Sequence, residues 1–160
     1  MSNAEAKSKV FVVGHDFGIS SMFQQRGWEA SSLEDANLVV FTGGADVDPS
    51  LYGEENFASH STLARDQREK TIYNQALELG KCMAGICRGG QFLNVMNGGK
   101  MIQHVDGHAT GRDHKLTDRV TGEEHSVTST HHQMMIPNDE TAEAVAIANL
   151  GMFACGDILK

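Results

Sequence analysis

A single cysteine stands between glycines where an apolar run ends. Residues 83–91 read MAGICRGGQ, so that Cys87 has Gly85 two positions before it and Gly89 two positions after it. Where a strand turns sharply into a helix, the flanking residues must be small because the backbones pack closely. The start of a helix also provides a partly positive field that favours a thiolate, the nucleophilic form of cysteine. The pattern therefore predicts a nucleophile at Cys87.

The alternative for any cysteine is a small, buried, hydrophobic side chain. The surrounding glycines favour the nucleophile at Cys87, whereas Cys82 lies inside an apolar run and Cys155 lies near the end of the sequence. We interpret Cys82 and Cys155 as hydrophobic residues of that kind. Three cysteines without a C-x-x-C spacing also argue against a disulfide framework or a cysteine-based zinc site.

The elements that would position this cysteine alternate between strand and helix. Unbroken apolar runs that end at glycine are typical of buried parallel strands, and apolar residues at helical spacing separate them. This alternation predicts a sheet with right-handed crossovers and helices on its faces. Polar, β-branched sequence then predicts a β-hairpin over 107–133. The strands are expected at 9–14, 38–44, 82–86 and 101–105, and the helices at 20–26, 64–79 and 92–96.

Composition excludes several function classes. The 160 residues include 13 Lys+Arg and 21 Asp+Glu, for a formal net charge of -8. Without a basic run, a partner bound through nucleic-acid phosphates is not expected. No stretch approaches the roughly 20 apolar residues that span a bilayer, and the polar start MSNAEAKSK does not resemble a secretory signal. We expect one cytoplasmic domain over 1–160, with residues 1–8 disordered, no membrane partner and no cofactor.

Eight histidines raise the question of a metal site. His104 and His108 stand at the two ends of HVDGH, and His131 and His132 are adjacent. Metal ligation needs side chains that converge on one point, often from helical i, i+4 spacing, and Gly107 disfavours a helix there. On spacing alone we predict no metal site.

Four stretches of the sequence resemble one known family. GICRGGQ is similar to the G-x-C-x-G-x-Q signature of class I glutamine amidotransferases. FTGGADVDPSLYGE at 41–54, NGGKMIQHVDGH at 97–108 and STHHQM at 129–134 resemble, in the same order, their gamma-glutamyl-gamma-aminobutyrate hydrolase branch, peptidase family C26. The resemblance covers roughly residues 9–150. It implies a flavodoxin-like α/β fold, with an open, mostly parallel sheet and helices on both faces.

The resemblance also implies roles for residues around the cysteine. Cys87 would attack the side-chain carbonyl of a glutamine or gamma-glutamyl amide and form a thioester that water hydrolyses. The oxyanion would be held by the backbone N–H groups of Gly43, Gly44 and Arg88. An ordinary turn after a strand would explain one of these two glycines equally well. Gln91 matches a position that contacts the substrate; without the motif it could equally be an exposed helix residue.

A second segment matches the part of the family that holds the amino-acid end of the substrate. It comprises Ser129, Thr130 and His131, which would act largely through backbone groups. The same resemblance disfavours His131 or His132 as the catalytic base, because it places both on the substrate-holding side. The expected ligand is thus a small molecule, a glutamine or a gamma-glutamyl amide.

One part of the family pattern is absent from the sequence. Class I amidotransferases complete their site with a His-x-Glu motif, in which the histidine is general base and acid and the glutamate orients it. The chain has no such motif, and no histidine follows Gln133. Three explanations stay open. The chain is a fragment or truncated form of a longer enzyme, or another polypeptide or a second copy supplies the base, or catalysis has been lost.

These observations lead to one expected function and one alternative. We expect hydrolysis of the side-chain amide of glutamine or of a gamma-glutamyl amine through a cysteine thioester. The enzyme would be either an amidotransferase that works with a synthetase subunit or a free-standing hydrolase. The alternative is a catalytically silent or incomplete binding subunit, which would tolerate the loss of the Cys87 thiol.

Overall fold

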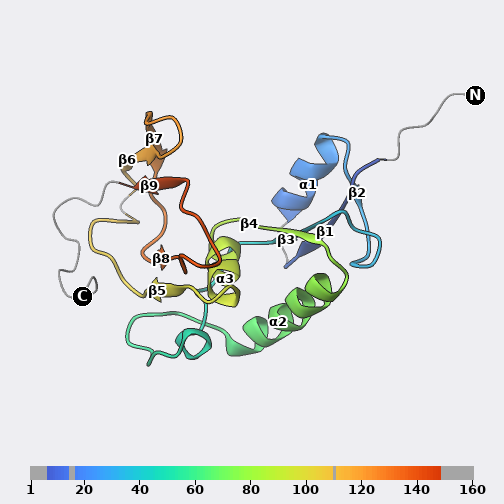
Figure 1. Ribbon diagram of the computed structural model, residues 1–160, viewed down its shortest axis with the longest axis horizontal. Coiled ribbons are helices and arrows are strands. Elements are labelled where there is room, and N and C mark those ends of the chain that lie inside the picture. Colours follow the sequence, from blue (N-terminus) through green and yellow to red (C-terminus); the bar gives the residue numbers. More distant parts are fainter. Residues whose placement is uncertain (1–6, 15–16, 110, 149–160) are drawn as a thin grey trace, which may run out of the picture.

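Four parallel strands form the central sheet (Figure 1). The computed structural model describes residues 7–14, 17–109 and 111–148. Because all four strands run in one direction, their carboxyl ends lie at the same edge of the sheet. The turns after the third and fourth strands are therefore neighbours, and Phe41 pairs with Gly85 there. The strands are β1 (Lys9–Val13), β2 (Glu29–Ala30), β3 (Leu38–Phe41) and β4 (Cys82–Gly85), in the spatial order β2-β1-β3-β4.

Helices cover both faces of this sheet. α1 (Phe17–Gln25) lies on one face, and α2 (Leu63–Glu78) and α3 (Arg88–Met96) lie on the other (Figure 1). Strand residues alternate between the faces, so Phe41 packs in the core beneath α2 and α3 while the fully buried Val40 points the other way. The flavodoxin-like α/β fold expected from the sequence is confirmed.

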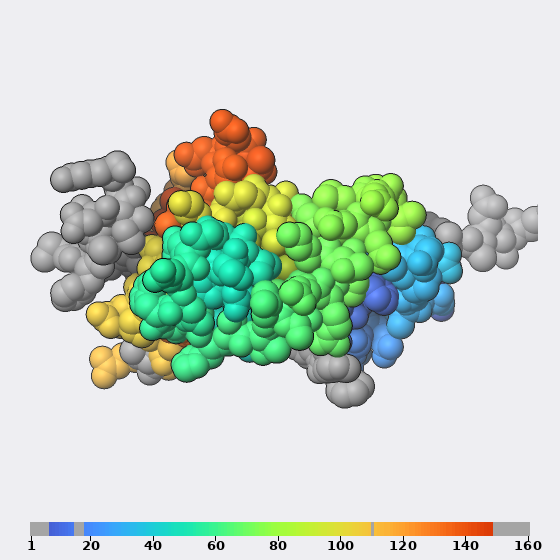
Figure 2. Space-filling model, turned by 90° about the horizontal axis from the view of Figure 1, so that it is seen from below, coloured from blue at the N-terminus to red at the C-terminus, as the bar shows by residue number. Residues whose placement is uncertain are grey.

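A second, antiparallel region follows α3. The hairpin expected over 107–133 is present, and a third strand extends it into a sheet of order β7-β6-β9. A separate two-stranded sheet lies between this region and α3 (Figure 1). A short 3-10 helix, η1 (Pro49–Tyr52), precedes α2 and lies beside it on the face seen in Figure 2. The strands are β5 (Lys100–Ile102), β6 (Asp113–Asp118), β7 (Glu124–Thr128), β8 (Met134–Ile136) and β9 (Ala146–Ala148).

Some sequence expectations need correction. Cys82, interpreted as a buried hydrophobic residue, is exposed, because it begins the outermost strand of the described sheet. The strand expected at 101–105 ends earlier, at Ile102, and pairs with β8 outside the central sheet. Residues 1–6 of the segment expected to be disordered, and Cys155, lie outside the described residues. Ser8 is described, and its carbonyl accepts the Glu29 N–H.

No helix among the described residues is both long enough and apolar enough to cross a membrane.

A buried ionic cluster joins the two helices on one face. The Arg88 side chain is 1% exposed and donates to the carboxylates of Asp66 and Glu69, which are 0% and 3% exposed. The guanidinium also lies 5.1 Å from the centre of the Phe92 ring. Burial raises the pKa of Asp66, and the Asp48 N–H and Arg88 oppose this rise. Buried ion pairs thus hold the start of α3 against α2.

This cluster predicts a large loss of stability in Arg88→Met. The substitution leaves two buried carboxylates without their cation, and breaking a buried pair typically costs about 3 to 5 kcal/mol of unfolding free energy. Because burial holds the folded pKa of Asp66 above its unfolded value, its ionisation lowers stability as the pH rises. The loss should therefore be larger at neutral than at mildly acidic pH.

Urea unfolding measures this loss, and Arg68→Met is the matched control because Arg68 is an exposed residue of the same helix, α2. Equal unfolding free energies for the two variants would contradict the role given to the cluster.

Candidate functional site

Cys87 occupies a strained turn between β4 and α3. Its φ of 55° and ψ of -121° lie in a region that residues other than glycine rarely adopt. It is the N-cap of α3, and its side chain is exposed. This is the geometry of a nucleophile elbow, in which a sharp turn lifts the side chain clear of the sheet. The strain is of the kind that accumulates at functional sites.

The glycines on either side of the cysteine are required by packing. A Cβ on Gly89 would collide with the backbone carbonyl of Phe41 in β3, and a Cβ on Gly85 would collide with the backbone of Gly89 and Gly90. The first turn of α3 therefore crosses directly over the ends of β3 and β4. The G-x-C-x-G pattern follows from this close crossing.

The loop after β3 lies against the cysteine. A Cβ built on Gly43 would be 3.6 Å from Cys87 Cβ and 3.9 Å from its Sγ. Gly44 has a φ of 134°, which favours glycine. Within the described part of the chain, the N–H groups of Gly43, Gly44 and Arg88 donate to no protein acceptor. Donors of the kind that an oxyanion needs thus lie next to the thiol, although their role stays a prediction.

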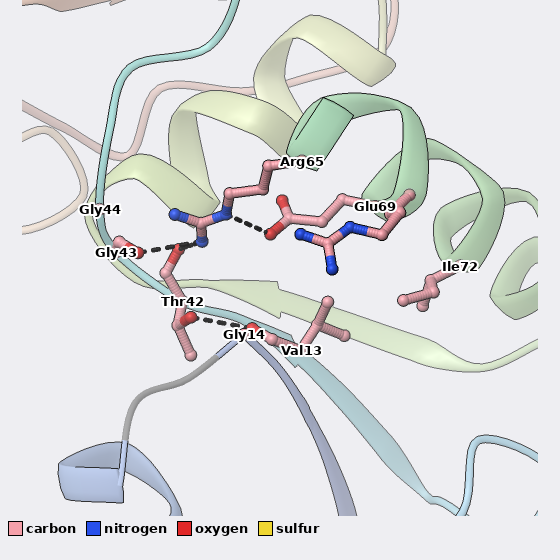
Figure 3. A pocket seen from close by; sticks show the side chains of 9 residues that line it. Val13, Gly14, Thr42, Gly43, Gly44, Arg65, Glu69 and Ile72 are labelled. Atoms are coloured by element: carbon pink, nitrogen blue, oxygen red, sulfur yellow. Dashed lines mark hydrogen bonds and ion pairs between the residues drawn. The ribbon is translucent and has the colours of Figure 1, made fainter. Parts of the chain in front are cut away.

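Arg65 of α2 holds this loop from behind (Figure 3). Its Nη2 donates to the carbonyls of Thr42 at 3.1 Å and Gly43 at 3.0 Å, and its Nε donates to Glu69 at 2.7 Å. In a planar trans peptide the C=O and the N–H point in opposite directions. Gripping these two carbonyls therefore turns the N–H groups of Gly43 and Gly44 away from Arg65.

A cavity of about 620 Å³ opens on the Arg65 side of the loop (Figure 3). Gly43, Gly44, Arg65 and Arg68 contribute to its lining, and Cys87 does not. The cavity lies behind the loop that faces the thiol. A substrate attacked by Cys87 would have to approach the loop from its other side.

Comparison with known proteins places this geometry in a family. The sequence profile of peptidase C26 matches residues 22–149, a span that includes the elbow and the loop after β3. The chain belongs to the peptidase C26 family. This confirms the resemblance found in the sequence.

Individual relatives of this C26 chain are glutamine amidotransferase-like. A putative glutamine amidotransferase-like protein of Lactococcus lactis is 34% identical over 134 residues, which cover 71% of this chain and 57% of the relative. A putative glutamine amidotransferase of Mycobacterium tuberculosis is 32% identical over 135 residues, which cover 72% of this chain and 43% of the relative. The chain thus spans about half the length of the curated relatives it matches.

A solved structure shares the fold of the C26 chain. A glutamine amidotransferase from Methylobacillus flagellatus superposes with a TM-score of 0.51 over 82% of this chain and 57% of the other, at 12% identity. At this identity the likeness supports the flavodoxin-like architecture and says nothing about substrate.

The remaining candidate residues fall into two groups. Gln91 is 9% exposed and sits one turn into α3, so the alternative of an exposed helix residue is excluded. Ser129 is buried and Thr130 is exposed in the turn between β7 and β8. Ser129 and His131 both pack against His108. Burial lowers the pKa of His108, and the neighbouring rings of His131 and His114 lower it further.

Sequence analysis missed the residues that support the site from behind. Arg65 and Glu69 fall within the helix expected at 64–79 and were given no role there, yet Glu69 is buried and Arg65 is partly buried. One signal could have found the buried carboxylates. Asp66 and Glu69 precede Tyr73 and Ala76 at helical spacing, so two carboxylates share a face with the buried residues of α2.

The elbow predicts opposite results for two adjacent substitutions. Gly89→Ala puts a methyl group onto the Phe41 carbonyl and should cost at least about 2 kcal/mol of unfolding free energy, because only a backbone shift relieves the overlap. In Gly90→Ala the nearest neighbour of the new Cβ is the Gly85 carbonyl at an ordinary 3.5 Å. Stability should be unchanged or raised by up to about 1 kcal/mol, since alanine favours a helix.

Urea unfolding of both variants checks this prediction. A Gly89→Ala chain as stable as Gly90→Ala would show that α3 does not cross β3 as closely as described.

Proposed function

We propose that this C26 chain provides the nucleophile of a glutamine amidotransferase or gamma-glutamyl hydrolase. The Cys87 sulfur attacks the side-chain amide carbonyl of the substrate, and the C–N bond breaks as ammonia or an amine leaves with a proton. Water then cleaves the C–S bond of the thioester, which releases the carboxylate product and restores the thiol. The reaction needs no redox partner.

The observation that carries this proposal is the strained, exposed thiol beside unpaired backbone donors. The positive φ at Cys87 has a cost, and neither a hydrogen bond nor a buried contact of its side chain explains it. The Gly43 and Gly44 N–H groups are directed away from Arg65, and the Arg88 N–H lies at the positive end of α3. Such donors stabilise an oxyanion when a carbonyl is attacked beside them.

The substrate class follows from family membership and from the candidate binding residues. Gln91 and the segment of Ser129, Thr130 and His131 would hold the glutamine or gamma-glutamyl part. A synthetase subunit that consumes ammonia, or a second copy of the chain, is the partner that we propose for an amidotransferase. A hydrolase would act on gamma-glutamyl amines unaided.

One observation favours the alternative of a silent or incomplete binding subunit. Among the described residues, no side chain hydrogen-bonds to the Cys87 sulfur, so no general base is in place there. A positioned acid or base typically contributes about 100- to 10,000-fold to the rate. The thiol of this chain should therefore react with an activated substrate analogue more readily than it turns over an amide.

Covalent labelling tests the nucleophile. Incubation with a diazoketone analogue of glutamine should add one adduct to the chain, because the thiol is exposed and lies beside the proposed oxyanion donors. Intact-mass spectrometry measures the adduct. It should vanish in Cys87→Ala and persist in Cys82→Ala, which is a matched control because both thiols are exposed.

Two results would count against the proposal. An adduct that survives in Cys87→Ala would show unspecific thiol reactivity. A folded wild-type chain with no adduct would favour the silent binding subunit.

Arg65 predicts a second, kinetic effect. Arg65→Gln removes the grip on the Thr42 and Gly43 carbonyls, so the N–H groups that face the thiol lose their alignment. Inactivation by the analogue should slow about 10-fold, below the roughly 100-fold loss caused by deleting an oxyanion donor. The concentration for half-maximal inactivation should stay the same, because these donors act during attack.

Arg68→Gln is the control, since Arg68 lines the same cavity without holding the loop. If Arg65→Gln weakened only the binding of the analogue, Arg65 would not be a positioning residue for the oxyanion loop.

A further inference from the structure

Three histidines from separate segments converge in the antiparallel region that follows α3. His108 follows β5, His114 lies in β6, and His131 lies in the turn between β7 and β8. One ring nitrogen from each lies within 4.8 Å of the other two. The ring centres are 5.0 Å apart for His108 and His114, 5.0 Å for His108 and His131, and 6.1 Å for His114 and His131. Sequence spacing gave no reason to connect these three residues.

Two of the rings are oriented by a hydrogen-bond contact at one ring nitrogen, Nδ1. His131 Nδ1 lies 2.8 Å from the Gln133 carbonyl, which can only accept, so Nδ1 is the donor and Nε2 is the nitrogen left to ligate. His108 Nδ1 lies 3.1 Å from the Ser129 hydroxyl, which in turn accepts the Ala109 N–H. Metal-binding histidines are held in this way, with one ring nitrogen fixed by a neighbouring oxygen and the other free to ligate.

The third ring carries an unexplained polar atom. His114 Nδ1 is buried and has no hydrogen-bond partner in the described part of the chain. Buried polar atoms are nearly always paired, and each exception calls for an explanation such as a missing ion. A cation bound to this nitrogen would supply the partner.

These three histidines differ from others in the chain. His104, His125 and His132 each lie within 4.0 Å of a carboxylate, namely Asp106, Glu123 and Asp46. No such ion pair is recorded for the three clustered rings within residues 7–14, 17–109 and 111–148. Imidazoles that meet without a carboxylate are suited to a divalent first-row metal ion.

We propose that His108, His114 and His131 bind one Zn²⁺ ion, with water in the fourth position. Zinc–nitrogen bonds of about 2.0 to 2.1 Å in a tetrahedral site place the nitrogens about 3.4 Å apart. Binding therefore draws the three ring nitrogens together from within their present 4.8 Å.

Bound zinc would fasten the proposed substrate-holding segment. His131 belongs to that segment, whereas His114 belongs to β6 and His108 to the loop after β5. One ion thus joins the turn between β7 and β8 to two other parts of the antiparallel region. The backbone groups of Ser129 and Thr130 would be ordered by this link, and Cys87 is not one of the three ligands.

Zinc titration of the full chain tests the proposal. Chelator-treated protein is titrated with Zn²⁺ against a chromophoric chelator, and Co²⁺ reports the site through the strong visible absorption of tetrahedral coordination. We expect one ion per chain. His114→Gln should weaken binding at least about 100-fold, and Ser129→Ala should weaken it about 10- to 100-fold because it frees the His108 ring. His125→Gln, on the neighbouring strand β7, should change binding less than about 2-fold.

Cysteine thiolates also bind zinc, so the titration is repeated in the Cys87→Ala chain. Unchanged affinity there would separate this site from the proposed catalytic thiol, and failure of labelling at Cys87 would leave the zinc result intact. Far-UV circular dichroism without metal establishes that each variant is folded. If His114→Gln is not folded, His108→Gln replaces it as the test variant.

Two outcomes would overturn the proposal. One is zinc binding that is equally strong in wild type, His108→Gln and His114→Gln, since the ion would then sit elsewhere. The other is the absence of a tetrahedral cobalt spectrum in the folded wild-type chain.

Discussion

Two buried carboxylates on α2 are the interaction on which the candidate site depends. Asp66 and Glu69 receive the Arg88 side chain from the start of α3, and Glu69 also receives Arg65, which holds the Gly43 carbonyl. The elbow and the loop beside it are thus positioned by one ionic network in which every link is a charge-assisted hydrogen bond. The sheet brings the two turns to the same edge, and the network fixes their orientation. Without it, the Thr42 and Gly43 carbonyls would lose the Arg65 contact that turns the Gly43 and Gly44 N–H groups away from α2.

The ionic network lies on the carbonyl side of the loop after β3. The residues that support the site are therefore different from the groups that would react. Arg88 would contribute its backbone N–H to the site, while its side chain is buried and bonds to Asp66 and Glu69. The cavity on the Arg65 side belongs to this supporting layer as well. Under the proposed function, the face toward the substrate would be made of glycine backbone. Such a surface lets a carbonyl approach closely, which a loop with larger side chains would prevent.

Whether a feature could be predicted from the sequence depends on how far apart its residues lie along the chain. The elbow around Cys87 was predictable because its requirements lie within five residues. The helices and three of the four strands of the central sheet followed from local periodicity, whereas the two-residue strand β2 did not. The grip of Arg65 on Gly43 joins residues 22 positions apart, and the His108, His114 and His131 cluster depends on how the hairpin folds back. Neither has a local signature. The exposure of Cys82 was mispredicted because an apolar run does not reveal that its strand lies at the sheet's edge.

The strained backbone conformation of Cys87 affects which substitutions selection would favour at this position. A residue with a side chain costs roughly 1 kcal/mol or more at a φ of 55°, and glycine would adopt the same turn without strain. A single nucleotide change converts a cysteine codon into a glycine codon. Mutation with selection for stability alone would therefore drift toward glycine at position 87. A cysteine there is best understood as the product of selection acting on its sulfur, against the preference of the fold.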